Sequence, residues 1–304
     1  MNYQQVINQI AGEILSEKVE GNVATYIPEL GKIDPNKFGV YLRTLSGESV
    51  AFGESEELFS VQSISKVLAL TMAFNLLGEK LWERVGVEPS GTPFNSLIQL
   101  EYERGIPRNP LINSGAMVIC DVLMDFYDDP LKAFIDFVRD VSGDASIHYN
   151  EAVAQSEKAH GFRNAALINL MKSFGNIRNP LDEVLKFYFY QCALEMSCKQ
   201  LAQTFLLYAG HGKHPVTHQE IISVSKIKRI NAIMQTCGFY DESGDFTFKV
   251  GLPGKSGVGG GIVAVHPGHF SVAVWSPCLN EKGNSIRGIK FLEELTTETK
   301  SSIF

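Results

Sequence analysis

The chain has 304 residues, of which 44% are hydrophobic and 20% are charged, so it can bury a sizeable globular core. Its formal net charge of −7 argues against a nucleic-acid partner, because binding to phosphates needs a basic face. No apolar run approaches the ~20 residues of a membrane span, and the N-terminus has no secretory signal pattern. We therefore expect a cytoplasmic protein that contacts no membrane.

The N-terminal part of the chain predicts a helix followed by a β-hairpin. Residues 1–20 carry apolar side chains at helical spacing, and residues 26–31 form a loop because they contain proline and glycine. Residues 38–44 and 49–52 alternate or carry β-branched side chains, and the Ser-Gly-Glu between them is typical of a turn.

An apolar run at helical spacing follows, and Ser63 lies just inside its start with Lys66 three residues later. Positions i and i+3 share a helix face, so the Ser63 hydroxyl and the Lys66 amine can meet. A helix N-terminus favours negative charge, which suits a site where an oxyanion forms. On its own this Ser-x-x-Lys pattern is weak, because a capping serine and a solvated lysine produce it too.

The middle of the chain predicts mostly helices. Residues 78–112 are rich in glycine and proline, which indicates a loop containing one short helix. The helices expected after this loop cover residues 113–127, 130–141, 149–158, 162–174, 180–190, 195–210 and 221–238.

The C-terminal part predicts strands at 246–252, 261–266 and 270–276, and a last helix at 284–297. Lys255-Ser256-Gly257 lies between the first two strands, where we expect an edge strand. A Ser-x-x-Lys followed downstream by Lys-Ser-Gly is the signature of penicillin-recognising serine acyl-transfer enzymes. The second motif therefore strengthens the first.

Strands at both ends and helices between them predict an α+β fold. The expected architecture is β-lactamase-like: one mixed antiparallel sheet built from both termini, with an all-helical lobe inserted between. We expect a single domain over residues 1–304, with an α/β lobe from residues 1–62 and 220–304 and a helical lobe from 63–219. Both motifs would face a cleft between the lobes.

The cysteines and histidines do not predict a metal or cofactor site. The five cysteines are an odd number without metal-type spacing, which favours buried free thiols. The histidines at 211, 214 and 218 cross a loop with glycine and proline, and no carboxylate or cysteine stands at ligand spacing.

Several stretches of the chain resemble the serine-dependent glutaminases, which have the β-lactamase-like fold and hydrolyse L-glutamine to L-glutamate and ammonia. The resemblance runs from about residue 26 to residue 267 and matches the short bacterial form, which lacks ankyrin repeats. Ser114 and Gly254 replace alanines that are common in the family. The matching stretches are residues 59–66 and 250–258, Asn113-Ser114-Gly115-Ala116, Ser156-Glu157 and Arg163-Asn164.

The resemblance implies amide hydrolysis through a glutamyl ester on Ser63, with Lys66 as the general base. Only a neutral amine accepts a proton, and we expect burial and a nearby Lys255 cation to lower the pKa of Lys66. Ser65 is the competing nucleophile, but no lysine stands three residues after it. The oxyanion hole implied by the family uses the backbone N–H groups of Ser63 and Val258.

Tyrosines complete the catalytic set that the resemblance implies, which is Ser63, Lys66, Tyr188, Tyr240 and Lys255. Tyr188 matches the family's tyrosine in a Phe-Tyr-Phe pattern, and Tyr190 is the alternative because registers slip easily. Tyr240 matches another active-site tyrosine of the family.

The substrate also carries an ammonium and a carboxylate, which a selective site must pair. Glu157 is expected to hold the ammonium, while Asn113, Asn164 and Tyr240 donate to the carboxylate or the side-chain carbonyl. Tyr26 falls in a family loop that reaches over the substrate. The implied substrate-binding set is Ser63, Asn113, Glu157, Asn164, Tyr188, Tyr240, Val258 and Tyr26.

L-Glutamine is the expected partner, and the family implies a homodimer or homotetramer. One alternative is another acyl transferase of the same fold, a β-lactamase or a D-alanyl peptidase. A second alternative is a protein that binds glutamine or another amino acid without turning it over. The intact Ser63–Lys66 and Lys255-Ser256-Gly257 sets argue against this binding protein.

Overall fold

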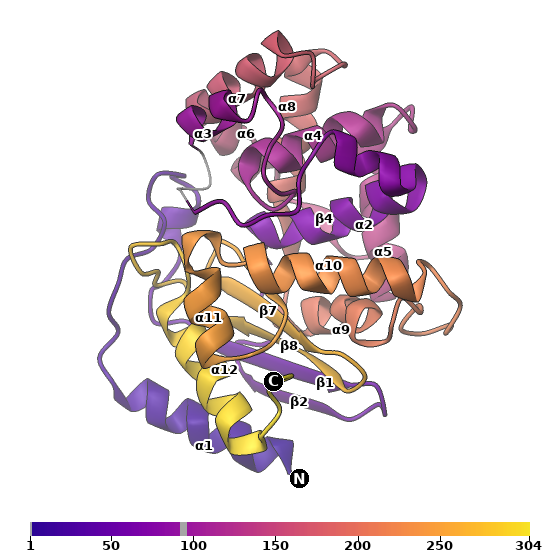
Figure 1. Ribbon diagram of the computed structural model, residues 1–304. Coiled ribbons are helices and arrows are strands. Elements are labelled where there is room, and N and C mark those ends of the chain that lie inside the picture. The colour runs from indigo at the N-terminus through magenta and orange to yellow at the C-terminus, as the bar shows by residue number, and fades with distance from the viewer. Residues whose placement is uncertain (1, 92–95) are drawn as a thin grey trace.

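The computed structural model describes residues 2–91 and 96–304 (Figure 1). Met1 of the first predicted helix and residues 92–95 of the predicted loop lie outside this range. The helices are α1 Tyr3–Ser16, α2 Ser65–Leu77, α3 Leu97–Tyr102, α4 Asn113–Met124, α5 Pro130–Ser142, α6 Glu151–His160, α7 Phe162–Ser173, α8 Leu181–Cys192, α9 Cys198–Ala209, α10 Val224–Cys237, α11 Ser243–Lys249 and α12 Ile286–Thr299.

A five-stranded sheet forms the lower half of the molecule in Figure 1, and every pairing in it is antiparallel. The strand order is β2-β1-β8-β7-β6, so the first two strands in the chain join the last three. The strands are β1 Gly39–Thr44, β2 Ser49–Gly53, β6 Gly254–Ser256, β7 Gly261–His266 and β8 Phe270–Trp275.

Both faces of the sheet are buried at β1, β7 and β8, and the side chains of these strands alternate between two cores. Val40 and Leu42 of β1 pack with α1 and α12 on one face, while Tyr41 belongs to the larger core on the other face. Helix α9 covers that second face. Because side chains in a strand alternate, a single run of apolar residues serves two cores.

The predicted fold class is confirmed, and so are the hairpin at β1 and β2 and the helices expected between residues 113 and 238, within a few residues at each end. The last predicted helix, 284–297, is α12. One short helix, α3, occurs in the predicted loop, and the 3-10 helix Gly78–Glu83 precedes it.

The strand predicted at 246–252 is wrong, because residues 243–249 form helix α11. The alternation of Phe246, Phe248 and Val250 suggested a strand. In the structure Phe246 stacks on Phe239 with 3.5 Å between ring centroids, whereas Phe248 is 88% exposed. The Val250 N–H donates to the Phe246 carbonyl at 2.8 Å, and both side chains reach the same core. Tertiary packing therefore overrides the local pattern.

A second, three-stranded sheet was not predicted. It pairs β3 Phe59–Ser60 with β5 Leu194–Met196 and β5 with β4 His148–Tyr149. Strands of two or three residues are too short to show a periodic pattern. This sheet ties the segment before Ser63 to the end of α8.

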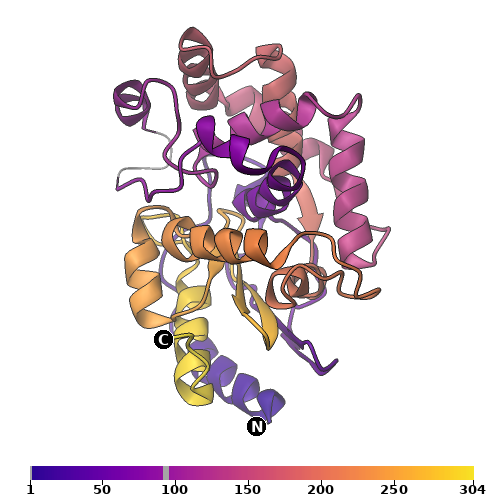
Figure 2. The same cartoon turned by 45° about the vertical axis from the view of Figure 1, so that its right-hand side comes forward.

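Helices α2 to α8 gather above the five-stranded sheet, and α10 runs between the two groups in both views (Figures 1 and 2). We propose that residues 1–62 with 220–304 and residues 63–219 are the two lobes of one domain spanning residues 1–304. None of the helices within residues 2–91 and 96–304 has the length and apolar character needed to cross a membrane.

Candidate active site

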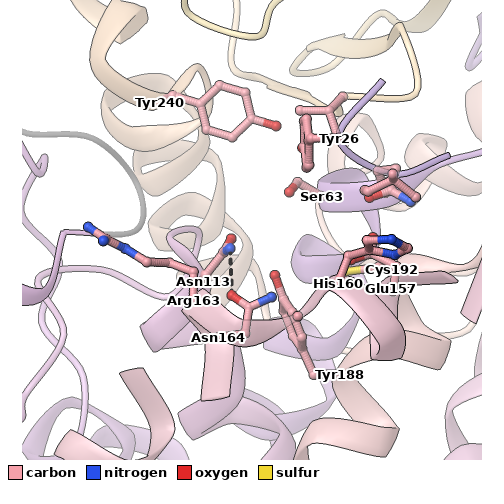
Figure 3. A pocket seen from close by; sticks show the side chains of 14 residues that line it. Tyr26, Ser63, Asn113, Glu157, His160, Arg163, Asn164, Tyr188, Cys192 and Tyr240 are labelled. Carbon is pink, nitrogen blue, oxygen red and sulfur yellow. Dashed lines mark hydrogen bonds between the residues drawn. The ribbon is translucent and has the colours of Figure 1, made fainter. Parts of the chain in front are cut away.

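A cavity of about 320 Å³ brings together every predicted site residue except Lys66 and Lys255 (Figure 3). Ser63, Tyr240 and Val258 form one side, here called the Ser63 wall. Side chains from α4, α6, α7 and α8 form the other side, here called the Glu157 wall. The residues of the Glu157 wall are Asn113, Glu157, Asn164 and Tyr188.

Ser63 lies in a 3-10 turn, Gln62–Ile64, directly before α2, and its side chain is buried at the cavity. The sequence predicts Ser63 just inside the start of the helix, whereas α2 begins at Ser65. The turn is strained: Gln62 has a φ of 51°, and Tyr240 on the same wall has a φ of 56°. Non-glycine residues rarely adopt this left-handed region, and such strain is concentrated at functional sites.

The Lys-Ser-Gly motif approaches the Ser63 turn closely from the edge strand β6. A Cβ on residue 257 would lie 2.4 Å from the carbonyl oxygen of Val61 and 3.4 Å from the backbone nitrogen of Ser63. Only glycine fits there, so Gly257 brings the backbone before Val258 against the Ser63 backbone. This proximity is what an oxyanion hole from two backbone N–H groups requires.

Lys66 lies behind the cavity, 1% exposed, in the first turn of α2. Its Nζ donates to Asn113 Oδ1 at 2.7 Å. Asn113 Nδ2 in turn donates to Asn164 Oδ1 at 3.0 Å, the bond drawn as a dashed line in Figure 3. Burial lowers the pKa of Lys66 to about 8, although nearby Cys192 and Glu157 act in the opposite direction. About a tenth of this amine is therefore neutral at pH 7, far more than for a solvated lysine.

Lys255 is fully buried in β6 and donates from Nζ to the Gly238 carbonyl at 2.9 Å and to the Ser256 carbonyl at 2.5 Å. Its Nζ also lies 4.4 Å from the centroid of the Tyr240 ring. Burial, and then the Lys66 charge, hold the pKa of Lys255 well below its usual value. The expected lowering of the Lys66 pKa by a Lys255 cation is not among the causes of its shift, whereas the Lys66 charge does lower the pKa of Lys255.

Glu157 is a buried carboxyl on α6, 8% exposed at the cavity. Burial raises the pKa of Glu157 to about 7, while a hydrogen bond with Gln62 and the charge of Lys66 lower it. Gln62 Nε2 also donates to Ser60 Oγ at 3.0 Å. Gln62 therefore links the Ser63 turn to the carboxyl, a contact that sequence reasoning missed.

The tyrosines separate into those inside and outside the cavity. Tyr188 lines it, whereas the Tyr190 hydroxyl donates to Glu151 at 2.7 Å on α6, away from the cavity. Burial raises the pKa of Tyr188 well above its usual value. Burial also raises the pKa of Tyr240, although a hydrogen bond with Ser63 opposes this. Both phenols therefore stay protonated and can donate.

Further residues that sequence reasoning did not assign also line the cavity. Arg163 and Gln62 stand next to assigned positions in the matching stretches, which was the available signal. Cys192 gave no signal, and burial raises the pKa of its thiol to about 12, which makes it a poor nucleophile. The unassigned lining residues are Ile27, Gln62, His160, Gly161, Arg163 and Cys192.

Within the described part of the chain, no group of three histidine, cysteine, aspartate or glutamate side chains is arranged to hold a metal. His214 of the histidine-rich loop is occupied within the protein. Its Nδ1 accepts from the Val216 and Thr217 N–H groups at 3.0 and 3.1 Å, and Nε2 lies 3.0 Å from the Asp140 carbonyl. The five cysteines are buried and unbonded to one another.

A sequence model of the family called Glutaminase matches residues 21–304. A relative named glutaminase from Christiangramia forsetii is 57% identical over 304 residues, which is 100% of each chain. A second, from Saccharophagus degradans, is 56% identical and covers 100% of this chain and 99% of its own.

Solved structures of glutaminases are also similar to this chain. A probable glutaminase called ybaS has a TM-score of 0.94 at 32% identity and covers 99% of this chain and 98% of its own. A probable glutaminase of Bacillus subtilis has a TM-score of 0.87 at 30% identity, covering 99% and 96%. Mglu, solved "in its glutamate form", has a TM-score of 0.91 at 29% identity, covering 97% of this chain and 68% of its own.

Proposed function

The chain belongs to the glutaminase family of amidohydrolases, and on that premise we propose that it hydrolyses the side-chain amide of L-glutamine. The products are L-glutamate and ammonia. One observation supports this proposal most directly: Ser63 and Glu157 line the same cavity of about 320 Å³. A nucleophile and an anion that can hold an ammonium thus face one small substrate.

Recognition is assigned to the Glu157 wall. An incoming α-ammonium favours the ionised form of Glu157, because an opposite charge nearby stabilises the carboxylate. Asn164 and the protonated Tyr188 lie beside it and can donate to the α-carboxylate. A site that pairs both charges rejects amides that lack either one. Tyr26 lines the mouth of the cavity and is 58% exposed, which fits a residue that closes over the substrate.

Acylation is assigned to Ser63 with Lys66 as general base. Lys66 takes the Ser63 proton through its neutral form, and Ser63 Oγ attacks the amide carbon. The Lys66–Asn113 hydrogen bond fixes the amine, since Asn113 itself is held by Asn164. The backbone N–H groups of Ser63 and Val258 stabilise the oxyanion. Cys192 is the other nucleophile at the cavity, and its raised pKa disfavours it.

Proton delivery to the leaving ammonia is assigned to Tyr240, which shares a hydrogen bond with Ser63. Its phenol stays protonated and can pass a proton between the base and the leaving group. Lys255 lies against the Tyr240 ring without lining the cavity, so we assign it to positioning Tyr240 and β6. Water then hydrolyses the glutamyl ester, and the same groups return their protons.

The test is ammonia release from L-glutamine, L-asparagine and D-glutamine by the wild type and by Ser63→Ala. We expect release from L-glutamine alone, lost in the variant, while glutamine binding stays measurable by calorimetry. Ser65→Ala is the matched control, because Ser65 donates to the Gln62 carbonyl at 2.7 Å rather than facing the cavity. Residual hydrolysis by Ser63→Ala above a few per cent would exclude Ser63 as the nucleophile.

The resemblance to the family also implies a homodimer or homotetramer, and the sequence favours the cytoplasm. We propose that the protein forms one of these homo-oligomers in the cytoplasm. Light scattering of the purified protein and fractionation of the cells that make it test them directly.

A further inference from the structure

The backbone turn that carries Tyr240 is strained, so other contacts must hold it. Tyr240 begins the 3-10 turn Tyr240–Glu242 with a φ of 56°, and its hydroxyl shares a hydrogen bond with Ser63. A non-glycine residue keeps such a conformation only when the surrounding structure fixes it. The contacts that fix this turn therefore also fix the direction of the Tyr240 hydroxyl.

The loop of residues 279–285, which precedes α12, lies against the Tyr240 ring. Leu279 and Ser285 form an antiparallel bridge at the base of this loop. Near its tip, a Cβ on residue 283 would lie 3.7 Å from Tyr240 Cε2. Leu279 also belongs to the same buried apolar cluster as Tyr240. The position of the loop therefore limits where the ring can lie.

Glu242 joins the turn to this loop through three hydrogen bonds. Asn284 Nδ2 donates to Glu242 Oε2 at 2.6 Å. Asn280 Nδ2 donates to Oε2 and Oε1 of the same carboxylate at 2.9 and 3.2 Å. Asn284 is fully buried, and its Nδ2 also donates to the Phe239 carbonyl, just before the turn, at 3.4 Å. Hydrogen bonds to a carboxylate are stronger than those between neutral groups, so Glu242 is the main link between the two segments.

A second link between the same segments is more exposed. Lys282 Nζ lies 2.5 Å from Asp241 Oδ2, but the lysine side chain is 51% exposed. Exposed ion pairs contribute little, because water and salt screen them and the side chains lose freedom. Glu242 does not line the active-site cavity, so it touches no substrate there. Any effect of Glu242 on the reaction must therefore pass through the residues that it holds.

We propose that Glu242 is a positioning residue for Tyr240, because its carboxylate holds the loop of residues 279–285 against the turn and keeps the Tyr240 hydroxyl beside Ser63. The inference rests on the proposed acyl-enzyme function, in which Tyr240 delivers a proton to the leaving ammonia. A displacement of about 1 Å can slow a reaction by about a hundredfold, because the reacting groups lose their alignment. The Glu157 wall takes no part in these contacts, so substrate binding is left intact.

The experiment is a double-mutant cycle of Glu242→Ala and Tyr240→Phe, in which steady-state kcat and KM for L-glutamine are measured. We expect Glu242→Ala alone to lower kcat by about ten- to a hundredfold, with KM within about twofold of wild type. In the Tyr240→Phe background the same change should lower kcat by less than about twofold, because no hydroxyl is left to position. An equal loss in both backgrounds, which a merely structural role would give, overturns the inference.

Two further variants sharpen the cycle. Asp245→Ala is the matched control with wild-type kinetics, because the ion pair of Asp245 with Lys249 stays within α11. Glu242→Gln keeps an acceptor oxygen for Asn284 and should recover most of the lost kcat. A Glu242→Gln variant as slow as Glu242→Ala contradicts a role through these hydrogen bonds.

If Glu242→Ala does not fold, Asn280→Ala takes its place in the cycle, since it removes two of the three hydrogen bonds at a partly exposed position. A slow Tyr240→Phe variant beside a Glu242→Ala variant with wild-type kcat rejects this inference and leaves the proposed function standing. Wild-type kcat in Tyr240→Phe would contradict the role proposed for Tyr240, and the inference with it.

Discussion

The two walls of the active-site cavity face the same space but are built differently. The Ser63 wall consists of 3-10 turns and the loop after an edge strand, and its backbone is strained at Gln62 and Tyr240. The Glu157 wall consists of side chains from regular helices joined by hydrogen bonds, such as that from Asn113 to Asn164. Figure 3 shows Ser63 and Tyr240 on the side opposite Asn164 and Tyr188.

This difference suits the two walls to different tasks, the Ser63 wall to stabilising the oxyanion and the Glu157 wall to binding the substrate. An oxyanion hole depends on where backbone N–H groups point, so accuracy there must come from backbone geometry. Recognition of two charged groups depends on side-chain chemistry, which regular helices present without strain. Changes to the Ser63 wall, including Lys66 behind it, should therefore lower kcat, and changes to the Glu157 wall should raise KM.

The largest effect should come from Lys66→Met, which keeps the buried length and removes the amine. We expect kcat to fall by about a thousandfold, since general base catalysis contributes that much. Lys66→Arg keeps a cation but cannot accept a proton, and it should be equally inactive. An Arg variant within tenfold of wild-type kcat would show that charge, not basicity, is what Lys66 supplies.

Gly257→Ala tests the backbone of the Ser63 wall. The added Cβ would lie 2.4 Å from the Val61 carbonyl oxygen, so the loop must move away from Ser63. We expect kcat to fall by about a hundredfold with little change in KM, as when an oxyanion donor is lost. Gly12→Ala on α1 is the control, because nothing lies within 4 Å of its Cβ. A rise in KM alone would contradict the assignment of catalysis to the Ser63 wall and of substrate binding to the Glu157 wall.

Glu157→Gln tests the other wall. Losing a charge-assisted partner should raise KM by about ten- to a hundredfold while kcat changes by only a few fold. Glu151→Gln on the same helix is the matched control, since Glu151 bonds Tyr190 away from the cavity. Steady-state kinetics decides the outcome, and an unchanged KM for Glu157→Gln argues against its role in binding the ammonium.

The smallest expected effect is a difference in pH dependence between the two walls, which should appear in KM for one wall and in kcat for the other. Burial raises the pKa of Glu157 to about 7, so the binding carboxylate forms as pH rises and KM should fall through that value. Burial lowers the pKa of Lys66 to about 8, so the neutral base forms above it and kcat should rise there. A flat kcat profile from about pH 6 to 9 is incompatible with a lysine base of this kind.

Much of the fold was predictable from the sequence, because long periodic segments were identified correctly. The failures were local. Phe246, Phe248 and Val250 alternate like a strand, but their helix is set by contacts with Phe239 that lie outside any sequence window. The short strands β3, β4 and β5 owe their pairing to the tertiary structure alone.

For the site, the residues that the resemblance to the family implies line one cavity, apart from the two buried lysines beside it. The strained φ of Gln62 leaves no trace in composition, and neither does its contact with Glu157. The pKa values of Lys66 and Lys255 are lowered by burial, and that of Lys255 also by the charge of Lys66. These effects depend on the folded structure, so the sequence alone could not give them.

The central claim is that a glutamyl ester forms on Ser63. Its most direct test is acid quenching of the enzyme during turnover of the γ-methyl ester of L-glutamate, whose leaving group departs readily. Mass spectrometry then locates the adduct among the digested peptides. We predict a glutamyl group on Ser63 that appears and decays with turnover. Turnover with an adduct on Cys192, or with none on Ser63, would contradict the account.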